Sequence, residues 1–126
     1  MADAGSLVLA GKTCIVGFFV VAGLCNLTPR QTRSHIDRLG ALGTPAPAFA
    51  FWAGLALQFT GCALIAFDWH ARIGVLCLIA FTVAATAIFH RFWKVEDPVR
   101  RNIGRIMLLN NVGILGGLLL LLALVD

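Results

Sequence analysis

Four long apolar runs, separated by short polar segments, set the pattern of this chain. They cover residues 7–27, 46–67, 73–92 and 107–125, and each is close to the roughly 20 residues that an α-helix needs to cross a bilayer. The pattern predicts an all-α membrane protein whose four transmembrane helices form an antiparallel bundle. No polar stretch approaches the size of an independently folding unit. We therefore expect a single membrane domain over residues 1–126, with any large catalytic apparatus supplied by a partner.

The connecting segments carry the signals that end one helix and begin the next. Thr28-Pro29 and Asp97-Pro98 each place a capping residue before a proline, as at the first turn of a helix. The first pair predicts a short surface helix that stops at Gly40, and the second predicts that the fourth helix begins at the surface before it enters the bilayer. Residues 68–72 are long enough only for a tight turn. The surface helix would carry basic and apolar residues side by side, namely Arg30, Arg33, His35, Arg38, Ile36 and Leu39.

The composition agrees with a membrane location. Hydrophobic residues make up 60% of the chain, charged residues 13%, and the mean hydropathy is +0.90. In a soluble domain roughly half of the residues are apolar. The four cysteines lie in or beside apolar runs without a CxxC pair, so we interpret them as small buried side chains.

Positive charge is concentrated on one side of the predicted bundle. The loops after the first and third spans hold eight Lys and Arg residues, whereas the other side holds only Lys12 and Arg72. Basic loops stay in the cytoplasm, so both termini are predicted on the non-cytoplasmic side. The net charge of +4 is then explained by topology and anionic lipid, and nothing resembles a nucleic-acid-binding module. We expect contacts with the lipid interface from Lys12, Arg72, Arg100, Arg101 and Arg105.

Polar and small residues inside the spans indicate where helices meet. Gln58 lies between Gly54 and Gly61 on one helical face, and because lipid tails offer an amide no partner, it should face another helix. A packing hydrogen bond or a ligand contact would each satisfy it. In the fourth span, Gly113 and Gly117 form a GxxxG motif, whose default meaning is close packing on a neighbouring helix.

The third span carries a line of polar residues along one face. Thr82, Thr86 and His90 are four residues apart, so a helix aligns them, and the line ends at the predicted cytoplasmic interface. In one interpretation these are an interface histidine and threonines bonded to carbonyls of their own helix, with Trp93 in the aromatic belt.

The other interpretation is a site for a quinone head group. A quinone carbonyl needs a hydrogen-bond donor, a histidine can give and take a proton near neutral pH, and an aromatic ring can stack on the quinone face. The residues of this candidate site are His90, Arg91 and Trp93, joined by Gln58 or Asn111 from neighbouring helices.

Five sequence features, in order along the chain, resemble the DoxX family of small bacterial four-helix membrane proteins. They are Gly11-Lys12 before the first span, Gly43-Thr44-Pro45-Ala46-Pro47 at the entry to the second, Arg72 at the start of the third, Phe89-His90-Arg91-Phe92-Trp93 at its end, and Asn111-Val112-Gly113-Ile114-Leu115-Gly116-Gly117-Leu118 in the fourth. The resemblance implies a multi-pass protein of the bacterial inner membrane. It also implies association with oxidoreductases, including thiosulfate:quinone oxidoreductase and oxidative-stress complexes, without implying an established active site.

Two positions depart from the pattern of that family. Relatives often have a carboxylate where this chain has Gln58. They also often have a lysine directly before the asparagine that corresponds to Asn111, where this chain has Asn110. Both changes remove a charge. Any proton-transfer or redox role that those charges have in relatives would be lost here.

Two functions fit these observations. The first is an accessory or structural subunit of a larger respiratory or redox complex, with lipid and other membrane subunits as partners. The alternative is a quinone-linked membrane redox protein with its head-group site near His90. The sequence assigns no catalytic residue and no metal site, because no Cys or His pair has the spacing of metal ligands. A haem would need two axial ligands, and His35 and His90 are the sole histidines predicted on one side of the membrane, so haem is disfavoured. Self-contained transport is disfavoured because the spans show no internal repeat and no buried acidic residue.

Overall fold

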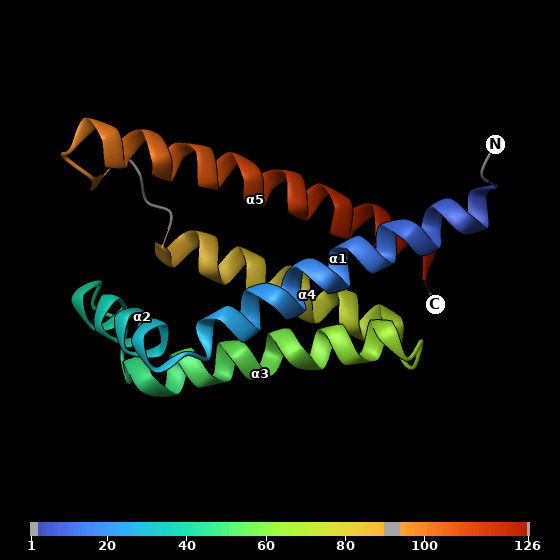
Figure 1. Ribbon diagram of the computed structural model, residues 1–126, viewed down its shortest axis with the longest axis horizontal. Coiled ribbons are helices and arrows are strands. Elements are labelled where there is room, and N and C mark those ends of the chain that lie inside the picture. The colour runs from blue at the N-terminus through green and yellow to red at the C-terminus, as the bar shows by residue number, and fades with distance from the viewer. Residues whose placement is uncertain (1–2, 90–93, 126) are drawn as a thin grey trace.

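The computed structural model describes residues 3–89 and 94–125, and within them the chain is helical with no strand (Figure 1). The helices are α1 (Ala4–Asn26), α2 (Pro29–Ala41), α3 (Pro47–Ala66), α4 (Ala71–Phe89) and α5 (Pro98–Leu124). All except α2 are long and apolar enough to cross a membrane. The predicted fold class, an all-α membrane protein with four spans, is therefore confirmed. The side of the membrane on which each end lies stays a prediction.

Local capping explains where the helices begin. Thr28 accepts a hydrogen bond from the backbone N–H of Gln31 at 3.4 Å, and Asp97 accepts one from Val99 at 3.1 Å. Each precedes a proline at the first helical position, where the missing N–H costs nothing. At the start of α1, the backbone hydrogen bond from Ser6 and then its side-chain bond lower the pKa of the exposed Asp3 carboxyl. As predicted, α5 begins well before the apolar run that starts at residue 107.

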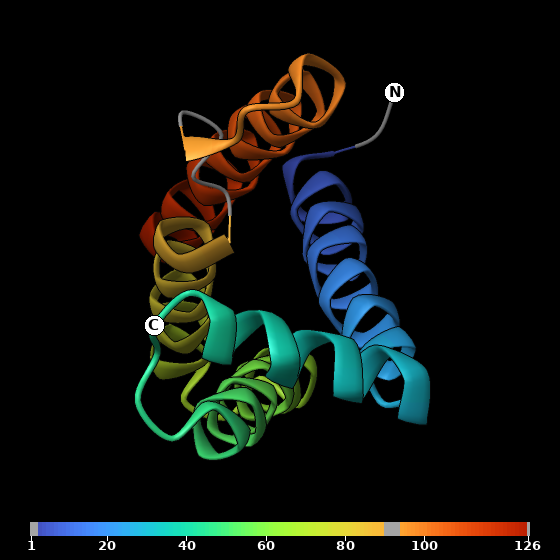
Figure 2. The same cartoon turned by 90° about the vertical axis from the view of Figure 1, so that its left-hand side faces the viewer.

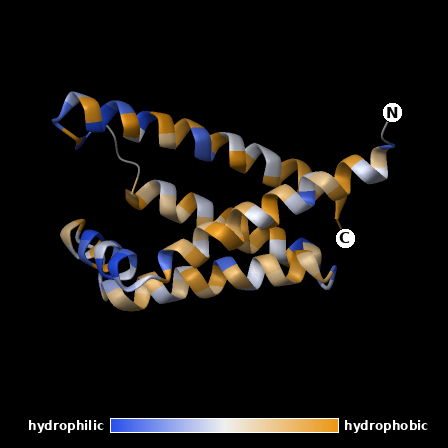
Figure 3. Cartoon of the chain, viewed as in Figure 1, coloured by the Kyte–Doolittle hydropathy of each residue, from blue (hydrophilic) through white to orange (hydrophobic). Residues whose placement is uncertain are grey.

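The helix α2 lies across one end of the bundle, away from both termini (Figures 1 and 2). Its hydrophilic residues gather there with those of the start of α5, whereas the middle of the long helices is mostly hydrophobic (Figure 3). One residue of α2, Leu39, is buried, and it packs with Phe51 and Leu55 of α3. The amphipathic surface helix predicted from the sequence is thus attached to the bundle by its apolar side.

The helices α3 and α4 form the most closely packed pair of the bundle. A tight turn joins them, in which Asp68 and His70 both have φ of 51°, in the left-handed region. The backbones cross at Gly61 and Gly74. A Cβ added to either glycine would lie 2.8 Å from the carbonyl oxygen of the other, so only glycine fits at this crossing.

The outer helices pack on this pair from two sides. α1 contacts α3, and α5 contacts α4. The start of α5 lies far from α1 and α2, whereas its C-terminal part approaches α1 (Figures 1 and 2). The larger apolar cluster therefore lies towards the end of the bundle that holds both termini, and consists of Phe19, Cys62, Ile65, Val75, Leu78, Leu118 and Leu121.

Candidate functional site

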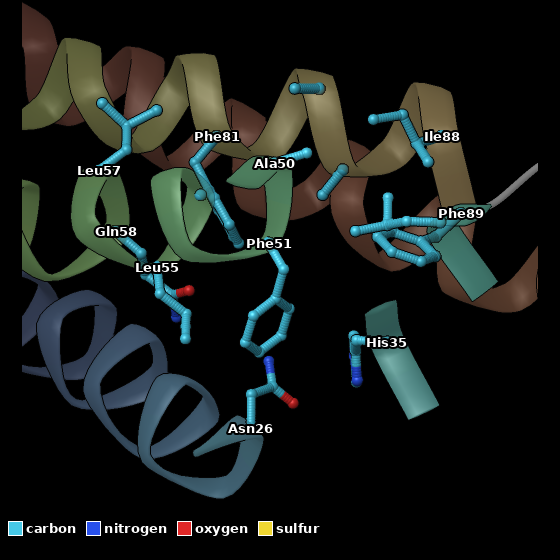
Figure 4. A pocket seen from close by; sticks show the side chains of 14 residues that line it. Asn26, His35, Ala50, Phe51, Leu55, Leu57, Gln58, Phe81, Ile88 and Phe89 are labelled. Atoms are coloured by element: carbon cyan, nitrogen blue, oxygen red, sulfur yellow. The ribbon is translucent and has the colours of Figure 1, made fainter. Parts of the chain in front are cut away.

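A cavity of about 130 Å³ lies between α3 and α4 at the end of the bundle covered by α2 (Figure 4). Its walls are mostly apolar. The polar side chains that line it come from three different helices: Asn26 from the end of α1, His35 from α2 and Gln58 from α3. An apolar pocket with a few converging polar groups is the usual form of a small-molecule site.

Gln58 is the most deeply buried polar residue of the cavity, with 1% of its surface exposed. Its Nε2 donates a hydrogen bond of 2.6 Å to the backbone oxygen of Phe19 in α1. Its Oε1 has no hydrogen-bond partner among the described residues. A buried acceptor left unpaired destabilises the fold by about 1–3 kcal/mol. The wall of the cavity thus covers a buried, unpaired amide oxygen.

Three aromatic rings form part of the cavity wall. Phe51 comes from α3, and Phe81 and Phe89 come from α4. The space between them exists because Gly54 has no side chain: a Cβ there would lie 3.6 Å from Phe81 Cε2, an ordinary contact, and larger side chains would extend into the cavity. A flat ring of benzene size is therefore a suitable occupant, since an apolar cavity of about 150 Å³ binds benzene.

The helix α2 covers the cavity with His35 and Leu39. The Nδ1 atom of His35 lies 2.8 Å from the backbone oxygen of Gln31. A carbonyl oxygen can only accept, so Nδ1 carries the proton of this bond. The imidazole ring packs against Phe51 and Phe89, with centroid distances of 5.8 and 5.7 Å, and the guanidinium of Arg38 lies 4.9 Å from the centre of the Phe89 ring. These contacts join α2 to the walls of the cavity.

A second polar contact joins α4 and α5. Asn111 donates from Nδ2 to Thr86 Oγ1 over 2.9 Å. One turn away, Thr82 is buried, and its Oγ1 is the other buried side-chain oxygen without a partner in the described part of the chain. The polar line predicted along the third span thus reaches a neighbouring helix at Thr86. Asn111 and Thr82 are not among the residues that line the cavity.

Of the residues predicted for a quinone site, the structure describes Gln58 and Asn111, which were alternatives. Gln58 lines the cavity, Asn111 contacts Thr86 outside it, and His90, Arg91 and Trp93 lie outside the described residues. From the sequence, His35 was predicted on the surface helix but was not assigned to a binding site. The spacing of His35 and Leu39, four residues apart on a helix, was the signal that the histidine shares the buried side of α2.

The predicted packing glycines have different surroundings. Gly61 touches α4 at the backbone crossing, and Gly54 faces the Phe81 ring. A Cβ at Gly113 would meet no atom within 4 Å in the described structure, and one at Gly117 would meet only Ile15 Cδ1, at 4.0 Å. The two glycines line a groove between α1 and α5 together with Cys14, Phe18 and Asn110.

The predicted interface residues lie at the two ends of the bundle. Near the α3–α4 turn, Lys12 Nζ is 4.0 Å from Asp68 Oδ1, and Arg72 is exposed. At the other end the exposed Arg100 lies 3.9 Å from Asp97 Oδ2, Arg101 donates to the Val95 carbonyl, and Arg105 donates to Asn102. Over the described residues, no three His, Cys, Asp or Glu side chains form a group that could hold a metal ion.

Comparison with known proteins identifies the family to which these features belong. The DoxX family model matches residues 7–91, which is well over half of the chain and includes most of α1 and all of α2, α3 and α4. No curated protein and no solved structure matches the chain. The matched range contains every residue that lines the cavity.

Proposed function

Because the chain belongs to the DoxX family, we propose that it acts as a membrane subunit of a redox complex and that its cavity binds the head group of a quinone. One observation carries the proposal: a cavity with aromatic walls is lined by three polar side chains that come from three different helices. A quinone, when bound, would supply the capacity to carry electrons and protons. The chain itself would bind and orient the ring and exclude water from it.

Each part of the cavity has a role in this proposal. Phe51 and Phe81 would pack against the ring faces, and the side-chain amide of Asn26 would donate a hydrogen bond to a ring carbonyl. His35 would close the site on the side of α2. The cavity is only partly enclosed, so ring substituents and an isoprenoid tail would extend out of it. His90, Arg91 and Trp93 follow the cavity residue Phe89 in the sequence and stay predicted contacts.

A glycine pair tests ligand binding directly. In the Gly54→Leu variant the new side chain would extend into the cavity, whereas in Gly113→Leu it would extend into open space. We expect Gly54→Leu to weaken binding of tetramethylbenzoquinone (duroquinone) at least about tenfold, since the ring and the leucine would compete for one volume. The measurement is calorimetric titration of the protein in lipid nanodiscs, with the signal of empty nanodiscs subtracted. Equal affinities of Gly54→Leu and Gly113→Leu, or no binding by the unaltered chain, would contradict the proposal.

A second proposed function is that of an accessory subunit held by helix packing, and the groove between α1 and α5 supports it. Asn110 is exposed there beside Gly113, in a helix long and apolar enough to cross a membrane, where lipid tails would offer an amide no partner. A helix of another subunit would satisfy the amide and use the close approach that glycine permits. Asn110→Leu should then reduce recovery of partner subunits in a mild-detergent purification, while Asn102→Leu near the surface should not. Recovery of the unaltered chain only as a monomer would contradict this function.

The location and orientation belong to the same proposal. The two basic segments, α2 and the start of α5, lie at one end of the bundle and both termini at the other (Figure 1). Under the positive-inside rule the termini would lie on the periplasmic side of a bacterial inner membrane. Reporter fusions at each terminus test this arrangement, and cytoplasmic activity of both reporters would contradict it.

A further inference from the structure

The Arg and Asp side chains of α2 lie along one side of that helix. Arg30, Arg33 and Asp37 follow one another at steps of three and four residues, and Arg38 is next to Asp37, so the helix brings all four to one face. All four are exposed, and they line an open depression on the surface of α2. We call this surface the arginine face; three positive charges and one negative charge give it a net charge of +2. The opposite side of α2 packs on the bundle through Leu39, so the arginine face points away from the protein.

The arginine side chains of this face are available to an anion from outside the chain. Neither Arg30 nor Arg33 forms an ion pair or a side-chain hydrogen bond with a residue that the structure describes. The guanidinium of Arg38 lies 4.9 Å from the centre of the Phe89 ring, a contact that holds the group in place without using its N–H donors. A guanidinium group has five such donors and can bind a phosphate through two of them at once.

The position of α2 brings the arginine face to the depth of the lipid head groups. Both ends of α2 are tied to helices that are long and apolar enough to cross a membrane, α1 before it and α3 after it. Leu27 and Leu42, which flank α2, are exposed, and so are Phe49 and Trp52 in the first turns of α3. Exposed apolar and aromatic side chains at the end of a membrane span are typical of the interface between lipid tails and water. The anions nearest to a helix at this depth are the phosphate groups of the lipids.

We infer that the arginine face of α2 binds the head groups of anionic phospholipids, with Arg30 and Arg33 as donors to the phosphate oxygens. A net positive face favours a lipid with a net negative charge over a zwitterionic lipid, whose cationic group the arginines repel. An acidic segment of a soluble protein would satisfy the same charge, but it would not account for the exposed Leu27 and Leu42 beside the helix. The inference does not depend on the proposed quinone site, because none of the residues of the arginine face lines the cavity.

The test is a titration of the protein in detergent micelles with phosphatidylglycerol and, separately, with phosphatidylcholine of the same acyl chains. Native mass spectrometry counts the lipids bound to each protein molecule. For the unaltered chain we expect phosphatidylglycerol to bind at least about tenfold more tightly than phosphatidylcholine. Arg30→Gln/Arg33→Gln should weaken the binding of phosphatidylglycerol by about fivefold for each arginine removed. Asp37→Asn should strengthen it, because that change removes the negative charge of the face.

Arg100→Gln/Arg101→Gln is the matched control, because it removes two positive charges at the same end of the bundle (Figure 1). Arg100 lies beside Asp97, and Arg101 donates to the Val95 carbonyl, so both have partners within the chain and we expect a smaller loss of affinity. Equal losses in the two double variants would show that only the total charge matters, and would overturn the inference. Equal affinities of the unaltered chain for the two lipids would also overturn it, and would leave an acidic protein segment as the candidate for this face.

Discussion

The α3–α4 crossing and the α1–α5 groove both contain glycines in membrane-spanning helices, yet they have opposite surroundings. At the crossing, Gly61 and Gly74 bring two backbones so close that a Cβ on either would meet the carbonyl oxygen of the other at 2.8 Å. In the groove, a Cβ on Gly113 would meet nothing within 4 Å of the described chain. The comparison teaches that a small residue permits close packing without specifying it. The neighbouring helix decides whether that packing takes place.

The two regions should also affect different properties of the protein: the crossing its stability, and the groove its association with other molecules. Lipid tails are as apolar as the helices, so close van der Waals contact and interhelical hydrogen bonds hold a membrane bundle together. The chain makes such contacts at the α3–α4 crossing and beside Gln58. It leaves the groove free for contacts with another molecule. Changes at the crossing should therefore alter folding, and changes in the groove should alter assembly.

The largest expected effect is that of an added methyl group at the crossing. Gly61→Ala should lower the free energy of unfolding by about 1–3 kcal/mol, because the backbone oxygen of Gly74 cannot move aside without separating the helices. Gly54→Ala on the same helix is the matched control, since its Cβ would make an ordinary 3.6 Å contact. Unfolding in mixed micelles with increasing dodecyl sulfate measures both. Equal stability of the two variants would show that the close backbone approach at the crossing does not limit the size of the residue there.

A smaller effect is expected at Gln58. Gln58→Met removes the hydrogen bond to Phe19 but also removes the unpaired Oε1, so the two changes oppose each other. We expect a net loss of roughly 1 kcal/mol or less, in the range of interhelical hydrogen bonds in membranes. The same unfolding titration measures it. A loss as large as that of Gly61→Ala would mean that the amide stabilises α1 on α3 more than packing does.

The contact between Asn111 and Thr86 should contribute less again. A double-mutant cycle with Asn111→Leu and Thr86→Val isolates the 2.9 Å hydrogen bond between α5 and α4. The coupling energy should be about 0.6 kcal/mol, the average for such pairs in a membrane. A coupling energy of zero would indicate that α5 is held on α4 by apolar packing alone.

The smallest effect on folding is expected in the groove. Gly113→Ala should not lower the free energy of unfolding, since the methyl group enters open space and alanine favours the helix more than glycine does. If the groove receives another helix, the same substitution should weaken the assembly, which size-exclusion chromatography with light scattering would detect. A folding defect comparable to that of Gly61→Ala would remove the contrast between the two regions.

The fold was largely predictable from the sequence, because its signals are local. Apolar runs of helical length gave the four spans, and Thr28-Pro29 and Asp97-Pro98 gave two of the helix starts. The site was less predictable, because its contacts join residues distant in the chain. The bond from Gln58 to Phe19 spans 39 positions, and the close approach of Gly61 to Gly74 depends on how two helices cross. The sequence predicted both glycines as packing positions, Gly113 from its GxxxG motif and Gly61 from its place beside Gln58. Nothing in the sequence distinguished the glycine in close contact from the glycine beside open space.

The buried amide of Gln58 also has an electrical consequence. A full charge moved across a membrane potential gains or loses about 2.3 kcal/mol for every 100 mV, so the energy of a carboxylate inside the membrane would depend on the membrane potential. An amide has no net charge, and Gln58 is fixed by its bond to Phe19. Binding of a neutral ring beside it would move no charge through the field. Occupancy of the cavity would then follow the supply of ligand in the bilayer and stay independent of the membrane voltage.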